Sequence, residues 1–181
     1  MVFLGIAFVL AMTIVTFLNV PNSSEGYRHP ILEELQEALR SDQVSGLKMR
    51  SYAQHGRDCF YVTNTRFNGT EGELDIGYRK EGKYTTDRLY CKLGEGNKGP
   101  VMTVRRGNRT APAVNYTLGH LDIEENCAIF MVKVNGREEC EQYVSSINID
   151  NPVPQCDEVY RSICKQRQVY NVYERSCQDS G

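Results

Sequence analysis

Hydrophobic and polar residues alternate along the middle of the chain, between about residues 47 and 145. The alternation is clear where Leu74, Ile76 and Tyr78 share one face, and it predicts strands with one buried side. Turn signals such as Asn135-Gly136 separate the segments, and no long helical stretches lie between them. An antiparallel sandwich or barrel is therefore expected, rather than a parallel α/β fold. The predicted strands are Leu47–Tyr52, Cys59–Phe67, Glu73–Arg79, Tyr84–Lys92, Val101–Arg106, Ala113–Leu118, Cys127–Val134 and Cys140–Ser145.

Two segments outside this region have helical spacing. Arg28–Arg40 places three leucines on one face and its glutamates on the other, which predicts a short amphipathic helix. From Gln155, apolar residues and two cysteines, Cys156 and Cys164, recur on one face of a second predicted helix. The tail, Gln168–Gly181, is expected to be extended.

The N-terminus and the sequons predict a secreted protein. No charged residue precedes Glu25, and Val2–Leu18 is almost wholly apolar. We interpret residues 1–20 as a signal peptide, with an uncleaved anchor as the alternative, and residues 25–181 as one domain. Four Asn-x-Ser/Thr sequons predict glycosylation at Asn22, Asn68, Asn108 and Asn115. The expected location is extracellular, with no membrane association after cleavage.

Seven cysteines lie in the predicted mature domain, and none forms a Cys-x-x-Cys pair of the kind found in zinc or redox sites. Disulfides are therefore the favoured interpretation, with one cysteine left over. The residues by themselves do not select a pairing. The cysteines are Cys59, Cys91, Cys127, Cys140, Cys156, Cys164 and Cys177.

Composition and motifs argue against several functions. The chain has 21 Lys and Arg against 23 Asp and Glu, whereas a nucleic-acid-binding protein needs an excess of cations. His29, His55 and His120 lie outside any nucleophile or metal motif, and no phosphate-binding glycine loop occurs. We expect no enzymatic activity, no cofactor and no metal.

Several short motifs, in order and spacing, resemble the tick salivary lipocalins, the histamine-binding-protein family. They are Arg57-Asp58-Cys59, Glu125-Asn126-Cys127, Cys140-Glu141-Gln142-Tyr143-Val144 and Val153-Pro154-Gln155-Cys156, followed by Cys164 and Cys177. The resemblance implies an eight-stranded lipocalin-like barrel with a helix at each end of the domain. It also implies the disulfides Cys59–Cys177, Cys127–Cys156 and Cys140–Cys164. Cys91 would then be a buried thiol or an intermolecular link.

The resemblance implies a salivary protein, expected to be a monomer, that sequesters a small host mediator and so suppresses inflammatory and haemostatic defence. For a biogenic amine such as histamine or serotonin, a buried carboxylate and an aromatic face are needed, and Glu141 and Tyr143 are the candidates. Ala128 stands where the family's amine pattern has an acid. A second acid could come from Glu71, Glu73 or Asp75.

Two alternatives to amine binding stay open. A leukotriene or fatty acid would need an apolar cavity with a basic residue at its mouth, for which Arg50, Lys133 and Arg105 are candidates. A surface-acting inhibitor of a host protein would work through its loops.

Overall fold

The computed structural model describes residues 28–165 and 167–177. The interpretation of residues 1–20 as a signal peptide and the sequon at Asn22 lie outside the described residues.

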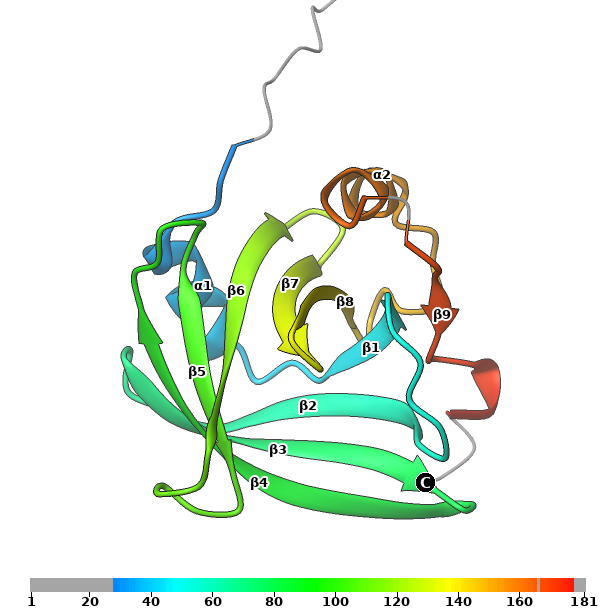
Figure 1. The fold of residues 1–181 in the computed structure, drawn as a ribbon, viewed down its shortest axis with the longest axis horizontal. Coiled ribbons are helices and arrows are strands. Elements are labelled where there is room, and N and C mark those ends of the chain that lie inside the picture. Colours follow the sequence, from blue (N-terminus) through cyan, green and yellow to red (C-terminus); the bar gives the residue numbers. More distant parts are fainter. Residues whose placement is uncertain (1–27, 166, 178–181) are drawn as a thin grey trace, which may run out of the picture.

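Eight antiparallel strands form a closed barrel (Figure 1). Each strand pairs with its neighbours in the sequence. Strand β1 also pairs with β8, the last strand of the barrel, and this pairing closes the sheet. The prediction of an antiparallel barrel is confirmed. The strands are β1 Ser45–Arg50, β2 Asp58–Phe67, β3 Glu71–Lys80, β4 Lys83–Gly94, β5 Val101–Arg106, β6 Ala113–Asp122, β7 Cys127–Val134 and β8 Arg137–Ser145.

The alternation correctly placed Leu74 and Ile76 on one face of β3. Both residues line the barrel interior, and so do Val114, Tyr116 and Leu118 of β6. Beyond Leu118 the register of β6 against β7 shifts, so that Leu121 also faces inward. Such an irregularity reverses which residues face the interior, and simple alternation does not reveal it.

Helix α1, Leu32–Arg40, packs against one end of the barrel. Leu35 is 2% exposed and belongs to the core that contains Leu74, Leu118 and Phe130. The helix begins four residues later than Arg28, the predicted start, because the backbone at Ile31 is extended. The Glu34 carboxylate accepts a hydrogen bond from the Ile31 N–H at 3.0 Å and so stabilises the first turn.

Helix α2, Pro154–Ile163, packs on the outside of the barrel against β6 and β7. Two disulfides, Cys127–Cys156 and Cys140–Cys164, join it to β7 and β8. The Glu125 carboxylate accepts hydrogen bonds from the backbone N–H groups of Gln155 and Cys156, at 3.1 and 2.8 Å. A negative charge at a helix N-terminus is favourable, so this contact and the disulfides fix the helix on the barrel.

The C-terminal tail contains a short strand, β9 Tyr170–Asn171, which pairs with β1, and a single 3₁₀ turn, Arg175–Cys177. A third disulfide, Cys59–Cys177, fastens the tail to β2. The three disulfides are the pairs that the family resemblance implied. Cys91 is 4% exposed and lies in the core, as the interpretation of a buried thiol requires.

Candidate functional site

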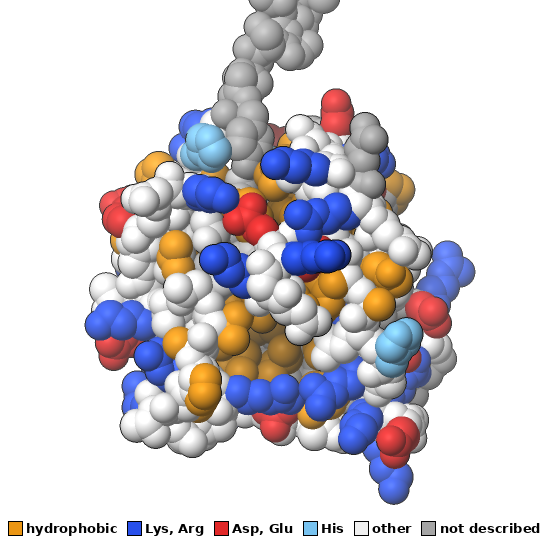
Figure 2. Space-filling view, viewed as in Figure 1, with side chains coloured by type: hydrophobic (Ala, Val, Ile, Leu, Met, Phe, Trp, Pro, Cys, Tyr) orange, Lys and Arg blue, Asp and Glu red, His pale blue; other side chains and the backbone are white. Residues whose placement is uncertain are grey.

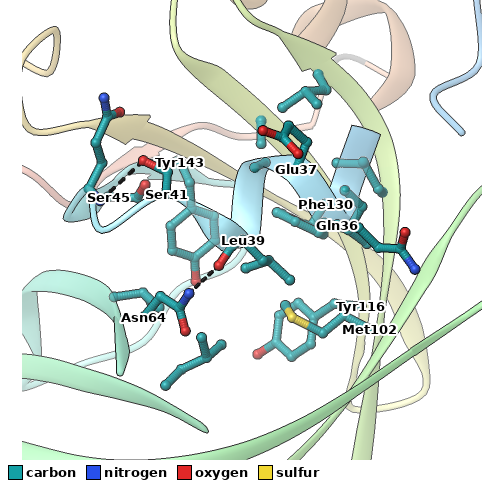
Figure 3. A pocket seen from close by; sticks show the side chains of 18 of the residues that line it. Gln36, Glu37, Leu39, Ser41, Ser45, Asn64, Met102, Tyr116, Phe130 and Tyr143 are labelled. Carbon is teal, nitrogen blue, oxygen red and sulfur yellow. Dashed lines mark hydrogen bonds between the residues drawn. The ribbon is translucent and has the colours of Figure 1, made fainter. Parts of the chain in front are cut away.

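A cavity of about 1080 Å³ occupies the barrel interior between α1 and the inner faces of the strands (Figure 3). Most of its wall is apolar and comes from β3 to β7. Representative lining residues are Leu74, Met102, Val104, Leu118 and Phe130. Barrels of eight strands are just wide enough to hold one small ligand, and this interior is hollow rather than filled by side chains.

Three aromatic rings form a continuous arc across three adjacent strands of this wall. Phe130 of β7 lies between Tyr116 of β6 and Tyr143 of β8, with ring centroids 6.4 and 6.0 Å apart. Both pairs are edge-to-face, which is a favourable geometry for aromatic rings. The arc gives the cavity a rigid surface against which an apolar or aromatic ligand can pack.

Most polar side chains that line the cavity lie at its α1 end. The Tyr116 hydroxyl has no hydrogen-bond partner among the described residues, and burial raises its pKa, so it stays a neutral donor and acceptor. The Asn64 amide of β2 donates to the backbone carbonyl of Leu39 in the last turn of α1, which ties the helix to the barrel (Figure 3).

The predicted ligand-binding acid, Glu141, lies beside the cavity without lining it. Its side chain is held by the hydroxyl of Tyr52 and by the hydroxyl of Tyr143, which donates at 2.8 Å. Glu141 is 3% exposed, and burial raises the pKa of its carboxyl, an effect that exceeds the lowering by the two hydroxyl groups and by Arg50. Tyr143 lines the cavity and stands between it and the carboxylate. The prediction that Glu141 and Tyr143 lie on the same side of their strand agrees with the hydrogen bond between them. Of the two, only Tyr143 lines the cavity.

The candidate second acids face away from the interior. Glu73 and Asp75 both form ion pairs with Arg88, and Glu71 forms one with Lys92. Because Leu74 and Ile76 point inward, their odd-numbered neighbours on β3 must point outward. None of these acids therefore lines the cavity.

Two basic residues line the cavity, Arg40 and Arg106, and the sequence singled out neither. On β5 the inward residues are Met102, Val104 and Arg106, so Arg105 has the opposite orientation. The Arg106 guanidinium donates hydrogen bonds to the Tyr78 hydroxyl at 3.1 Å and to the Asp87 carboxylate. The bond from Arg106 lowers the pKa of the Asp87 carboxyl.

The other two basic candidates do not line the cavity either. Arg50 is 4% exposed and donates to the Gln54 side chain at 2.7 Å and to the Gln54 carbonyl at 3.0 Å. Lys133 is exposed. It lies three residues after the inward-pointing Phe130 on β7, so its side chain faces outward. None of Arg50, Lys133 and Arg105 therefore lines the cavity, whereas Arg106 does.

The remaining predicted sites have simple structural settings. Asn68, Asn108 and Asn115 are all exposed. Within residues 28–165 and 167–177 no group of three or more His, Cys, Asp or Glu is placed to hold a metal ion. In the same part of the chain no helix combines the length and apolar character needed to span a membrane.

A closed eight-stranded antiparallel barrel with an interior cavity and flanking helices defines a lipocalin-like protein. The chain belongs to the tick histamine binding protein family, whose model matches residues 29–179. No curated protein matches the chain.

Solved structures with the same fold are distant in sequence. Japanin from Rhipicephalus appendiculatus, bound to cholesterol, is 14% identical with a TM-score of 0.55, covering 75% of this chain and 95% of japanin. A serotonin complex of AM182 is 12% identical with a TM-score of 0.60, covering 79% and 91%. Lobster apocrustacyanin A1 is 13% identical with a TM-score of 0.55, covering 76% and 78%. At these identities the likeness shows the fold, and the family assignment rests on the family model.

Proposed function

We propose that this protein is a secreted lipocalin that sequesters an apolar small molecule with an anionic end, such as a fatty-acid-derived host mediator. The observation that carries the proposal is the chemistry of the barrel wall. The strand wall is mostly apolar and contributes the guanidinium of Arg106, whereas the buried carboxylate of Glu141 is shielded by Tyr143. The other lining guanidinium, Arg40 of α1, is paired with Glu37. An apolar chain would bury its surface against the wall, and its carboxylate would pair with Arg106.

The size of the cavity also supports this class of ligand. Pockets for drug-sized ligands range from roughly 300 to 1,000 Å³. At about 1080 Å³ the cavity lies at the upper end of that range, so a single-ring amine would leave much of it unfilled.

The charged groups at the cavity are not arranged for a buried cation, which needs a carboxylate to offset its desolvation. The acidic lining residues lie at the α1 end, and several are already engaged. Glu34 pairs with Arg28, Glu37 pairs with Arg40, and Asp122 accepts a hydrogen bond from the Glu125 N–H.

A biogenic amine is the second candidate, favoured by the family and by Glu141 with its aromatic neighbours. It requires Tyr143 to rotate away so that the carboxylate meets the ligand's ammonium group. The aromatic arc would then supply the face for a cation and ring.

Secretion is supported by the three disulfides, which persist in oxidising compartments, and by the exposed sequons. The proposed activity is stoichiometric removal of the mediator from host tissue. It therefore depends on affinity and abundance, and needs no turnover.

Calorimetric titration with a long-chain fatty acid, a leukotriene, histamine and serotonin tests the proposal. We expect binding of the first two, weakened by Arg106→Gln and unaffected by Glu141→Gln. Tight binding of an amine that Glu141→Gln abolishes would establish the second candidate and overturn the first. Absence of binding by all four, with capture of a host protein, would indicate a surface-acting protein.

A further inference from the structure

The two ends of the barrel carry opposite charge. In an up-and-down barrel alternate loops meet at the same end, so the β1–β2, β3–β4, β5–β6 and β7–β8 loops form one rim. These loops and the strand residues next to them carry six basic side chains that reach the surface, compared with two acidic ones. Arg50 also lies in this region but is buried, so it is not counted. The basic residues of this rim are Arg57, Lys80, Lys83, Arg106, Arg109 and Arg137, and the acidic ones are Asp58 and Glu81.

The opposite end is acidic. It consists of α1 with its flanking residues and of the β2–β3, β4–β5 and β6–β7 loops. Its acidic residues are Glu33, Glu34, Glu37, Asp42, Glu71, Glu95, Asp122, Glu124 and Glu125, against the basic Arg28, Arg40 and Lys98. The formal net charge of the whole chain is only -2, so this separation is a property of the fold that overall composition hides.

Two of the six rim cations are paired, Arg106 with Asp87 and Arg109 with Glu73, and the other four are not paired with any described residue. Lys80 and Lys83 lie directly opposite each other in the β3–β4 hairpin, and like charges in that position destabilise a sheet. Neither lysine forms an ion pair with a described residue, and the same holds for Arg57 and Arg137. Arg57 and Arg106 also both lie against the ring of Tyr78, with guanidinium carbons 4.8 and 5.4 Å from its centroid.

The cavity also extends to the basic end. Figure 2 shows a hollow with hydrophobic side chains inside it and Lys and Arg side chains gathered around it. Arg106, Pro112 and Val114, which border the cavity, belong to the β5–β6 hairpin at this end. A cleft with apolar walls and a border of one charge concentrates the electric field at its mouth.

We propose that this basic rim attracts anionic ligands to the cavity mouth and repels cationic ones, so that the charge of a ligand controls how fast it binds. The inference rests on the proposed function and extends it, because rim residues other than Arg106 would select the charge of the ligand without touching it. Long-range attraction of this kind raises association rates by roughly 10 to 1,000-fold and weakens as salt shortens the screening length.

The test measures association rate constants by stopped-flow fluorescence for a fluorescent long-chain fatty acid and for the primary alcohol of the same chain. The variant Lys80→Glu/Lys83→Glu reverses two rim charges that lie outside the cavity lining. The matched control Lys92→Glu/Lys98→Glu makes the same change in total charge on exposed lysines near the acidic end.

We expect the rim variant to bind the fatty acid more slowly by about threefold or more at low ionic strength, with the difference disappearing near 1 M salt. The alcohol should bind the rim variant and the wild type at equal rates, and the control variant should resemble the wild type with both ligands. Equal slowing by the rim and control variants, or slowing of the alcohol as well, would overturn the steering proposal. Failure of both ligands to bind the wild type would overturn the proposed function itself.

Discussion

A hollow barrel lacks part of the core packing that stabilises a filled one, so covalent links should carry an unusual share of its stability. The disulfide Cys59–Cys177 is the clearest case, because it closes the longest loop and fastens the tail that carries β9 to β2. We predict a large loss of stability in the double variant Cys59→Ala/Cys177→Ala.

The magnitude follows from the loop that the bond closes. For two cysteines 118 residues apart, the chain-entropy model of cross-linking gives about 5 kcal/mol at 25 °C. Non-covalent contacts retain part of the tail after the bond is removed. The Tyr84 hydroxyl donates to the Cys177 carbonyl at 3.1 Å, and Arg79 donates to the Ser176 carbonyl at 3.3 Å. Because whole domains are stable by only about 5 to 15 kcal/mol, the loss should be conspicuous.

Urea unfolding monitored by circular dichroism measures this loss. The double variant should unfold at a much lower urea concentration, with a steeper dependence on urea because its unfolded chain is less constrained. Cys91→Ala is the matched control, since it removes a buried sulfur without removing a cross-link. The control should lower the free energy of unfolding by about 1 to 2 kcal/mol, with an unchanged slope. A double variant that loses less than this control would refute the reasoning.

Three further predictions concern the interior. Burial raises the pKa of the Cys91 thiol to about 11, so a thiol reagent at pH 8 should label no cysteine in the native protein and one after unfolding in urea. Because the folded-state pKa of Glu141 is raised, its contribution to stability is present below pH 4.5 and is lost as the pH rises through the folded-state value. The free energy of unfolding of the wild type relative to Glu141→Gln should therefore fall with increasing pH above about 4.5, and a constant or rising difference would contradict the assigned direction. Leu118→Trp should fill the cavity and weaken ligand binding by about tenfold or more, whereas Ile147→Trp, at a side chain that is 64% exposed and outside the cavity lining, should leave binding unchanged.

The fold was largely predictable because its signals are local. The bounds of Val101–Arg106 and Cys127–Val134 are those of β5 and β7, since turn residues flank both segments and alternation runs through them. The tail was harder, because Tyr170–Asn171 pairs with β1, more than a hundred residues away, and a two-residue strand leaves no periodic pattern. The pairing of the cysteines came from family resemblance, since spacing alone does not select partners.

The site was less predictable because it depends on where strands meet. Alternation placed Glu141 and Tyr143 on one face of their strand. It could not show that Tyr52, about ninety residues earlier in the chain, forms a hydrogen bond with the Glu141 carboxylate. Arg106 could have been found from the sequence, because it continues the inward series of Met102 and Val104 on β5. The opposite charges of the two barrel ends become visible only when alternate loops are grouped by topology.

Native mass spectrometry of the purified protein, mixed with equal concentrations of a long-chain fatty acid and serotonin, tests the central claim most directly. An interior lined by apolar side chains and Arg106 predicts a one-to-one complex with the mass of the fatty acid, absent from Leu118→Trp. A complex with serotonin in its place, or equal fatty-acid binding by Leu118→Trp, would contradict it.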